Sequence, residues 1–369
     1  MHAIENTISL LKKADLEKTY ATVGLDGFVD RIMRVVDKKN SDLSVSYIKD
    51  ITSFSERIAK AAGKSAAIEK HVQQVKLGGN SPIMANAMAA LGIDLTYIGA
   101  LGSEGSIHPV FEPLSQKAAI INLCEAAKTD ALEFNDGKLM FQEIASLDNI
   151  TYDRIIDEIG EDNFIQLIDK STFAAFNHWT ALMGMNDIWK GIQERICPKI
   201  SKRERKIFFD LADPAKRNDA DIEDALEIIS GFTPWYYTIL GLNESESEHM
   251  CRVLDCEPKD SLNLEELMQA RAEAIRSHMD IDCVTVHPIS CAAAADRNGT
   301  AVVQGPYIAK PKISTGAGDH YNAGFCLGHI LGGTLSDCLQ TGVGVSGFYV
   351  RNAKSPTIND LAEFLESLA

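Results

Sequence analysis

The sequence predicts an α/β fold, a three-layer sandwich with a mostly parallel central sheet flanked by helices, together with a small β lid. Short apolar runs alternate with helix-periodic segments, which is typical of a parallel sheet with helices on its faces. Polar residues follow several of these runs directly, as Asp210 and Asn243 do. A few extended segments break the alternation, and these predict the separate lid.

The alternating elements can be placed in order along the chain. In an open parallel sheet, ligands bind beyond the carboxyl ends of the strands. We therefore expect the binding site at the sheet edge that carries Asp210 and Asn243. Strands are expected at residues 22–25, 95–98, 173–176, 207–209, 238–240 and 280–286, and helices at residues 82–91 and 262–278.

The lid strands are expected at about residues 29–37, 70–77 and 130–144. The third segment contains Asn135-Asp136-Gly137, which is a strong signal for a β-hairpin. We expect one domain over residues 1–369, with the lid closing over the site and keeping water away from the transferred group. Two unrelated edge hairpins are the alternative.

The charge balance excludes several classes of function. The chain has 36 basic and 52 acidic residues and a formal net charge of −16. Nucleic acids and anionic membranes attract basic surfaces, so we expect neither as a partner. No apolar run reaches the roughly 18 residues of a membrane span, and residues 1–20 lack the apolar core of a signal peptide. The eight cysteines form no C-x-x-C pair and are expected as free thiols, which indicates a cytoplasmic protein.

The most informative motif is Thr315-Gly316-Ala317-Gly318-Asp319, which leads into a helix-compatible apolar segment. A Gly-rich loop that opens a helix presents bare N–H groups and about half a positive charge, which suits a phosphoryl group. We expect the N–H groups of Gly316, Ala317 and Gly318 to form an anion hole. Asp319 would then be the general base that accepts the proton of an attacking hydroxyl. The alternative for Asp319 is an acidic residue that is favoured near any helix N-terminus.

Two further motifs suit a ligand that is rich in hydroxyl groups. Gly78 and Gly79 remove side chains, so that a ligand can approach the backbone, and Asn80 both donates and accepts hydrogen bonds. Asp26 and Asp30 lie four residues apart around a glycine and are expected to accept hydrogen bonds from substrate hydroxyls. The alternative for Asp30 is a turn residue.

Asn243 and Glu246 are the candidate metal residues. A carboxylate can hold Mg²⁺ through the water shell of the ion, which leaves few direct protein ligands. The alternative is an Asn N-cap with Glu at the third helical position, which forms a capping box. The two roles are compatible.

Together these motifs resemble the ribokinase-like (PfkB) carbohydrate kinase family over nearly the whole chain. The resemblance implies a ribokinase-like fold and ATP-dependent phosphoryl transfer to a hydroxyl of a small sugar or related polyol, with Mg²⁺ as cofactor. It also implies nucleotide contacts from Asn243, Thr315, Gly316 and Gly318, and a homodimer formed through the lid. Four motifs occur in the family's order: Asp26-Gly27-Phe28-Val29-Asp30, Gly78-Gly79-Asn80, Asn243-Glu244-Ser245-Glu246 and Thr315-Gly316-Ala317-Gly318-Asp319.

Three positions depart from the pattern of that family. Ile313 stands where the family usually has Asp, and Ile83 stands where it has Asn. The segment His287-Pro288-Ile289-Ser290-Cys291 replaces a Gly-rich turn. These changes leave the nucleotide pocket, and with it the phosphate donor, open. Downstream of Asp210, Arg217 or Lys216 either faces nucleotide phosphates or forms a solvated charge pair.

A nucleoside kinase is the main alternative among enzymes. It would favour an aromatic clamp around the base, for which Phe28, Phe141 and Trp179 are available. A non-catalytic nucleotide- or sugar-binding relative is the second alternative, although binding alone gains nothing from an acid such as Asp319 beside phosphate. A dinucleotide oxidoreductase is disfavoured, because Gly24-Leu25-Asp26-Gly27 does not match G-x-G-x-x-G.

Overall fold

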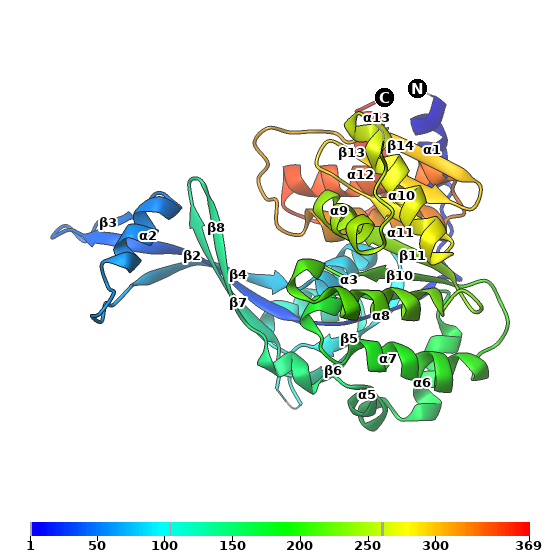
Figure 1. Ribbon diagram of the computed structural model, residues 1–369, viewed down its shortest axis with the longest axis horizontal. Helices are drawn as coiled ribbons and strands as arrows, with labels where there is room; N and C mark the ends of the chain where they lie inside the picture. The colour runs from blue at the N-terminus through cyan, green and yellow to red at the C-terminus, as the bar shows by residue number, and fades with distance from the viewer. Residues whose placement is uncertain (1, 104, 260–261) are drawn as a thin grey trace.

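The main sheet of the computed structural model has nine strands in the order β14-β13-β12-β11-β10-β9-β1-β5-β6 (Figure 1). The structure describes residues 2–103, 105–259 and 262–369. In this order, every neighbouring pair of strands between β12 and the edge strand β6 is parallel. At the other edge, β13 and β14 are antiparallel to their neighbours. The strands are β1 (Tyr20–Leu25), β5 (Asp94–Ala100), β6 (Ala119–Cys124), β9 (Phe173–Phe176), β10 (Lys206–Asp210), β11 (Tyr237–Leu242), β12 (Cys283–Val286), β13 (Cys291–Asp296) and β14 (Gly299–Gln304).

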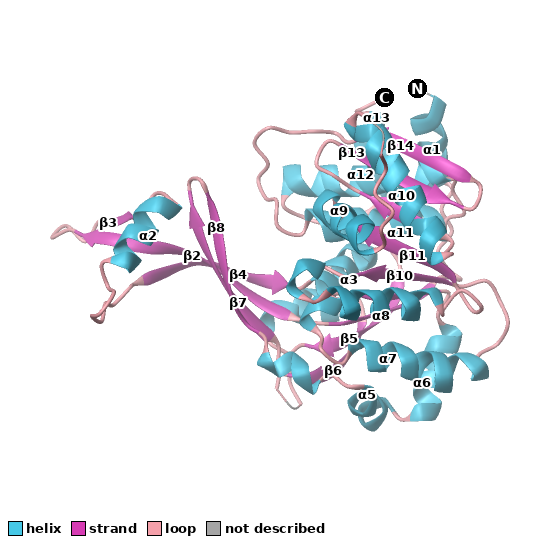
Figure 2. Ribbon diagram, viewed as in Figure 1, coloured by secondary structure: helices cyan, strands magenta, loops and turns pink. Residues whose placement is uncertain are grey.

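Helices cover both faces of this sheet, as Figure 2 shows. One face packs against α5 (Tyr152–Ile159), α6 (Glu161–Lys170), α7 (Met185–Gly191), α8 (Asp219–Ser230), α9 (Glu244–Val253) and α10 (Leu264–Met279). The other packs against α1 (His2–Lys12), α3 (Asn80–Ala90), α4 (Glu112–Ser115), α11 (Ala317–Ile330), α12 (Leu335–Asn352) and α13 (Ile358–Glu366).

The two hydrophobic cores follow from the alternation of side chains along the strands. Phe208 and Phe209 are neighbours in β10, yet Phe208 lies in the core beside α11 and Phe209 lies in the core beside α7. Successive residues of a strand point to opposite faces, so a fully apolar strand is buried on both sides. The predicted three-layer sandwich with a mostly parallel sheet is confirmed.

A second, smaller sheet projects from this body and forms the lid (Figure 1). Strands β7 and β8 pair through the turn at Asn135 and Asp136, where the sequence predicts a hairpin. Helix α2 (Ile51–Ala59) covers the distal part of the sheet, and neither α2 nor β3 was predicted. A small core of Met33, Phe54 and Leu132 lies beneath α2. The lid strands are β2 (Phe28–Lys39), β3 (Val45–Tyr47), β4 (Lys70–Gly78), β7 (Ala127–Phe134) and β8 (Gly137–Glu143).

The strand register divides the lid into two faces. Asp30 of β2 lies beside Lys76 of β4 and Thr129 of β7, and Glu133, four residues further along β7, lies beside Lys138 of β8. These residues share one side of the pleat, which we call the inner face. The intervening residues form the outer face, which includes Arg31, Val75, Lys128 and Phe141.

Candidate active site

The candidate site lies at the carboxyl ends of the central strands, where the sequence predicts it. Asp26 follows β1, Asp210 ends β10, and Asn243 follows β11. Asp319 lies in the first turn of α11. The carboxylates of Asp26, Asp210 and Glu246 are close enough to Asp319 to act on its titration. Segments that are far apart in the sequence thus converge on one cluster of acidic groups.

The N-terminus of α11 presents backbone donors at this edge. Gly316 is the N-cap residue, and its φ of 89° is a left-handed conformation that favours glycine. The Ala317 N–H donates to the Ser314 carbonyl at 3.1 Å. The N–H groups of Gly316 and Gly318 have no protein acceptor among the described residues. Of the three donors predicted for the anion hole, Gly316 and Gly318 are therefore free, whereas Ala317 is engaged in the turn.

Two side chains contact backbone carbonyl groups of this turn. The His320 ring contacts the Gly316 carbonyl through Nδ1 at 2.7 Å, and the Tyr349 hydroxyl donates to the Thr315 carbonyl at 3.0 Å. The two rings stack with their centroids 3.5 Å apart. Burial lowers the pKa of His320 to about 4, so the ring is neutral at pH 7. His320 therefore supports the loop rather than adding charge to the site.

Asp319 is surrounded by like charges. Burial raises its pKa well above the usual range, and the carboxylates of Asp210, Asp26 and Glu246 raise it further. A carboxyl group in such surroundings binds a proton more readily than a free aspartate does. Perturbed acids of this kind are typical of catalytic sites.

Asp26 is fully buried and acts first as a helix cap. Its two carboxylate oxygens accept hydrogen bonds from the N–H groups of Asn80 and Ser81, at 3.0 and 2.9 Å. Helix α3 needs this long-range cap, because its own N-cap residue, Gly79, has no side chain. The His178 Nδ1 contacts the same carboxylate at 2.5 Å.

The di-glycine motif makes room for protein carboxylates. A Cβ on Gly78 would lie 2.3 Å from Asp30 Cγ, and a Cβ on Gly79 would lie 2.7 Å from Asp26 Oδ2. Gly79 also has a φ of 93°, which L side chains rarely adopt. The sequence predicts that these glycines admit a ligand to the backbone. In the structure the space beside them holds Asp26 and Asp30, which are themselves predicted substrate residues.

Asp30 faces the site from the inner face of the lid. Burial raises its pKa, while the charge of Lys76 and a hydrogen bond from Thr129 lower it. Burial lowers the pKa of Lys76, and Asp30 raises it. Asp30 therefore lies in a regular strand, opposite Lys76 of β4, which excludes the alternative of a turn residue.

Asn243 and Glu246 form a capping box at the start of α9. Asn243 Oδ1 accepts from the Glu246 N–H at 2.9 Å, and Glu246 Oε2 accepts from the Asn243 N–H at 2.8 Å. Burial raises the pKa of Glu246, and the nearby Asp210 carboxylate raises it further. A cap uses one oxygen of Glu246 and leaves Oε1 for another partner. No group of three or more His, Cys, Asp or Glu residues in the described ranges is arranged to hold a metal ion.

A cavity of about 570 Å³ opens beside the N-terminus of α11. Of the four predicted nucleotide residues, Asn243 and Gly318 line it, whereas Thr315 and Gly316 do not. The segment that replaces the family's Gly-rich turn contributes to its wall. Such a largely apolar cleft with a few polar groups suits a heterocyclic base. The lining residues are Asn243, His287, Pro288, Ile289, Cys291, Gly305, Pro306, Tyr307, Ile308, Ala309, Pro311, Ser314, Ala317, Gly318, Tyr321, Val343, Ser346, Gly347 and Val350.

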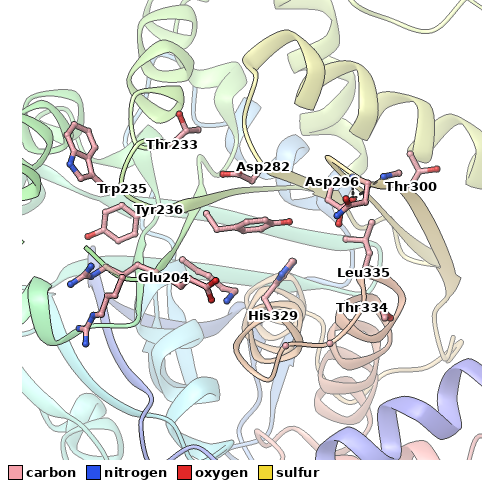
Figure 3. A pocket seen from close by; sticks show the side chains of 18 residues that line it. Glu204, Thr233, Trp235, Tyr236, Asp282, Asp296, Thr300, His329, Thr334 and Leu335 are labelled. Carbon is pink, nitrogen blue, oxygen red and sulfur yellow. Dashed lines mark hydrogen bonds between the residues drawn. The ribbon is translucent and has the colours of Figure 1, made fainter. Parts of the chain in front are cut away.

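A larger hollow of about 820 Å³ lies at the opposite, amino ends of the strands (Figure 3). Some of its polar groups are engaged with the protein itself. Asp282 accepts hydrogen bonds from the Thr238 N–H and from Arg297, both at 2.9 Å, and Thr334 caps α12. Because the hollow lies at the edge of the sheet away from the Gly-rich turn and the acidic cluster, it is not the candidate active site.

Four residues near the site were not assigned from the sequence. Asp210 accepts from the Ala212 N–H and from Asn322, and burial raises its pKa. Its position at a strand end was a usable signal. His178 carried the same signal, because it follows the predicted strand at residues 173–176. Lys76 and Lys138 carried none, because only the tertiary fold brings them to the motifs.

Comparison with known proteins agrees with this geometry. Residues 7–368 match the family model described as prokaryotic ketohexokinase. A ketohexokinase of Haloferax volcanii is 27% identical over 346 residues, which are 92% of this chain and 89% of that protein. Among solved structures, Thermotoga maritima ribokinase has a TM-score of 0.62 at 13% identity, and the alignment covers 94% of this chain and 99% of the ribokinase. Methanocaldococcus jannaschii nucleoside kinase has a TM-score of 0.59 at 16% identity, and the alignment covers 94% of this chain and 98% of the nucleoside kinase.

The fold and the site together define a carbohydrate kinase of the ribokinase-like type, as the sequence motifs predict. More narrowly, the match over residues 7–368 shows that the chain belongs to the prokaryotic ketohexokinase family.

Proposed function

We propose that this chain transfers the γ-phosphoryl group of ATP to a hydroxyl of a ketohexose, with Asp319 as the general base. Family membership makes the chain an ATP-dependent sugar kinase, and the names of the family and of the Haloferax volcanii relative suggest the ketohexose. The observation that carries the catalytic assignment is the position of Asp319. Its neighbour Gly318 lines the nucleotide cavity, while Asp26 on the other side lies close enough to raise its pKa.

The proposed step is a direct displacement. The sugar hydroxyl oxygen forms a bond to the γ-phosphorus, its proton passes to Asp319, and the bond from the γ-phosphorus to the β,γ-bridging oxygen breaks to release ADP. The free N–H groups of Gly316 and Gly318 donate to oxygens of the transferring group. Such catalysis rests mainly on positioning and electrostatics. A carboxyl group with a raised pKa is also a better base near neutral pH.

We assign the sugar hydroxyls to Asp30, Asn80 and the His178 ring. Asp26 supports these groups, because both of its oxygens already accept hydrogen bonds from α3 and one also contacts His178. The His178 ring is also fixed by stacking on Phe28, with centroids 5.4 Å apart. Polar groups held this firmly reject substrates that lack the matching hydroxyl.

Mg²⁺ is part of the proposal, with Glu246 and Asn243 holding it largely through water. The fit rests on the donor set: hard carboxylate and amide oxygens, with the Glu246 Oε1 outside the capping box and Asp210 nearby. When bound, Mg²⁺ would neutralise charge on the nucleotide phosphates. A site that keeps several waters on the ion needs no dense cluster of protein ligands.

The experiment is a coupled ADP-release assay with MgATP and a panel of ketohexoses, aldohexoses, polyols and nucleosides. We expect turnover on a ketohexose that collapses in Asp319→Asn. Turnover on a nucleoside alone would overturn the proposal. So would nucleotide binding without turnover on any compound, since that describes a non-catalytic relative.

The aromatic clamp of a nucleoside kinase does not form in this structure. Trp179 is completely buried, with its Nε1 donating to Asn186. Phe141 lies on the outer face of the lid and is 54% exposed. Phe28 alone of the three stays beside His178. The observation that favoured a nucleoside over a sugar is thereby removed.

We also infer a homodimer formed through the outer face of the lid. Val72, Val75 and Phe141 are about half exposed there, and exposed apolar clusters on sheets mark interaction surfaces. Sedimentation equilibrium should give twice the chain mass, and Phe141→Glu should shift the protein toward monomer. A wild-type monomer at micromolar concentration would contradict the inference.

None of the helices in the described ranges is long and apolar enough to cross a membrane, and a cytoplasmic location stays a prediction.

A further inference from the structure

The candidate active site gathers five acidic side chains. They are Asp26, Asp30, Asp210, Glu246 and Asp319, and the phosphates of a bound nucleotide would bring further negative charge. Charge that develops on a transferring phosphoryl group needs preorganised positive groups. A protein cation close to Gly316 and Gly318 is therefore of particular interest.

Of the two basic residues that the sequence offered for this role, Lys216 is exposed and Arg217 is engaged elsewhere. The Arg217 guanidinium lies over the Trp179 ring, 4.4 Å from its centroid, and Nε contacts Asp221 at 3.2 Å. Lys76 is on the inner face of the lid, where burial lowers its pKa and so disfavours its charged form. Arg217 is thus held by other groups, and Lys76 is less readily charged than a free lysine.

Lys138 differs from both of these residues. It is the second residue of β8 and points from the inner face of the lid toward the Gly-rich turn. Its Nζ donates to Thr315 Oγ1 at 2.6 Å, across 177 residues of sequence. Thr315 immediately precedes the N-cap Gly316, so the ammonium group contacts a residue that is one position from the free N–H of Gly316 and three from that of Gly318. An ammonium group has three donors, and this contact uses one of them.

We propose that Lys138 is a catalytic residue that completes the phosphoryl site from the lid. This inference rests on the proposed function and deepens it. In the displacement, the hydroxyl proton still passes to Asp319, and Lys138 exchanges no proton. Its ammonium group donates hydrogen bonds to the equatorial oxygens of the transferring group, opposite the N–H groups of Gly316 and Gly318. Since Lys138 belongs to the lid, the site is complete only when the lid is down.

The test compares Lys138→Met with Lys190→Met, a matched loss of charge in α7, away from the lid. The Lys190 side chain is 45% exposed, and its exposed partner Asp224 lies at 3.3 Å. We expect Lys138→Met to lower kcat about 10²–10³-fold, the usual cost of losing one electrostatic donor at a transition state. Lys138→Arg should recover part of that loss. Lys190→Met should stay within about twofold of wild type, as for other surface charges.

A binding measurement separates catalysis from lid structure. Calorimetry with MgADP alone should show similar affinity in wild type and Lys138→Met. With MgADP, aluminium fluoride and the ketohexose together, which mimic the transferring group, the variant should bind about 10²-fold more weakly. If the affinity for MgADP alone falls by the same factor, or if only the sugar KM changes, the assignment is overturned. Lys138 would then only fasten the lid to the Gly-rich turn.

The two proposals fail in different ways. A wild-type protein that phosphorylates no sugar overturns the proposed function and the role of Lys138 with it. An active wild type with an equally active Lys138→Met overturns only the inference about Lys138.

Discussion

Gly78→Ala tests whether the di-glycine motif exists to admit Asp30. The new Cβ would lie 2.3 Å from Asp30 Cγ and Oδ1 and 2.4 Å from Oδ2. Comfortable contact between such atoms needs about 3.5 Å, so the carboxylate must retreat by about 1 Å. Gly78 has no positive φ, so the substitution adds no strain from that source. The effect therefore reports on the contact with Asp30.

Two magnitudes follow from this displacement. Overpacking a filled site costs about 1–3 kcal/mol of folding stability, which urea unfolding measures. A hydrogen bond between a charged acceptor and a substrate hydroxyl is worth about 1.5–3 kcal/mol, so the sugar KM should rise roughly 10- to 150-fold. The ATP KM should change little, because the nucleotide cavity does not include Asp30.

Gly137→Ala is the matched control on the same sheet. A Cβ there meets Ile51 Cδ1 at 3.1 Å, the end of a flexible side chain that can yield. Its sugar KM should stay within about twofold of wild type, the scale of an accommodated surface change. If Gly78→Ala retains the wild-type sugar KM while losing stability, Asp30 does not grip the substrate and the reasoning is refuted.

Further predictions concern charge and the metal. Asp319→Asn should lower kcat about 10²–10⁴-fold, and an unchanged kcat would remove the base assignment. Because the pKa of Asp319 is raised, its contribution to stability is full below the unfolded pKa and is lost as pH rises through the folded value. The variant should therefore melt above wild type near neutral pH and match it toward pH 4, with calorimetric scans as the check. His178→Asn should raise the sugar KM about tenfold with little change for ATP; the reverse pattern would contradict the sugar role. Glu246→Gln should raise the Mg²⁺ requirement about tenfold or more, whereas Glu266→Gln, in the equivalent capping box of α10, should not.

The strand ends were predictable from the sequence because they depend on local patterns. The apolar runs before Asp26 and Asp210 are short and are followed at once by polar residues, so period and length suffice. The Gly-rich turn before Asp319 was predictable for the same reason, since its backbone demands are local. Strands that are apolar on both faces are typical of a parallel sheet covered by helices on each side, so the sheet type was predictable as well.

What could not be predicted depends on contacts between distant segments. Asp26 caps α3 across 54 residues. The sequence therefore predicts a carboxylate that is available to the substrate, whereas in the structure that carboxylate already accepts hydrogen bonds from α3. Strand β13 consists largely of alanine, which favours helices, yet it is buried in the sheet because tertiary packing overrides that preference. Lys138 gave no signal at all, since its partner Thr315 is reached only through the lid hairpin.

With the proposed roles of Asp30 and Lys138, the shape of the lid would also set the order of binding and closure. Asp30 lies two residues from the base of β2, about 7 Å along the strand, whereas Lys138 lies at a level about 20 Å from that base. If the sheet pivots by about 10° at its base, Asp30 moves about 1 Å and Lys138 moves about 3–4 Å, by the same strand spacing. With these proposed roles, the carboxylate that binds the sugar lies near the pivot and the ammonium group of Lys138 lies far from it. The sugar would then be bound before Lys138 reaches the Gly-rich turn, so a water molecule that enters first would meet an incomplete phosphoryl site.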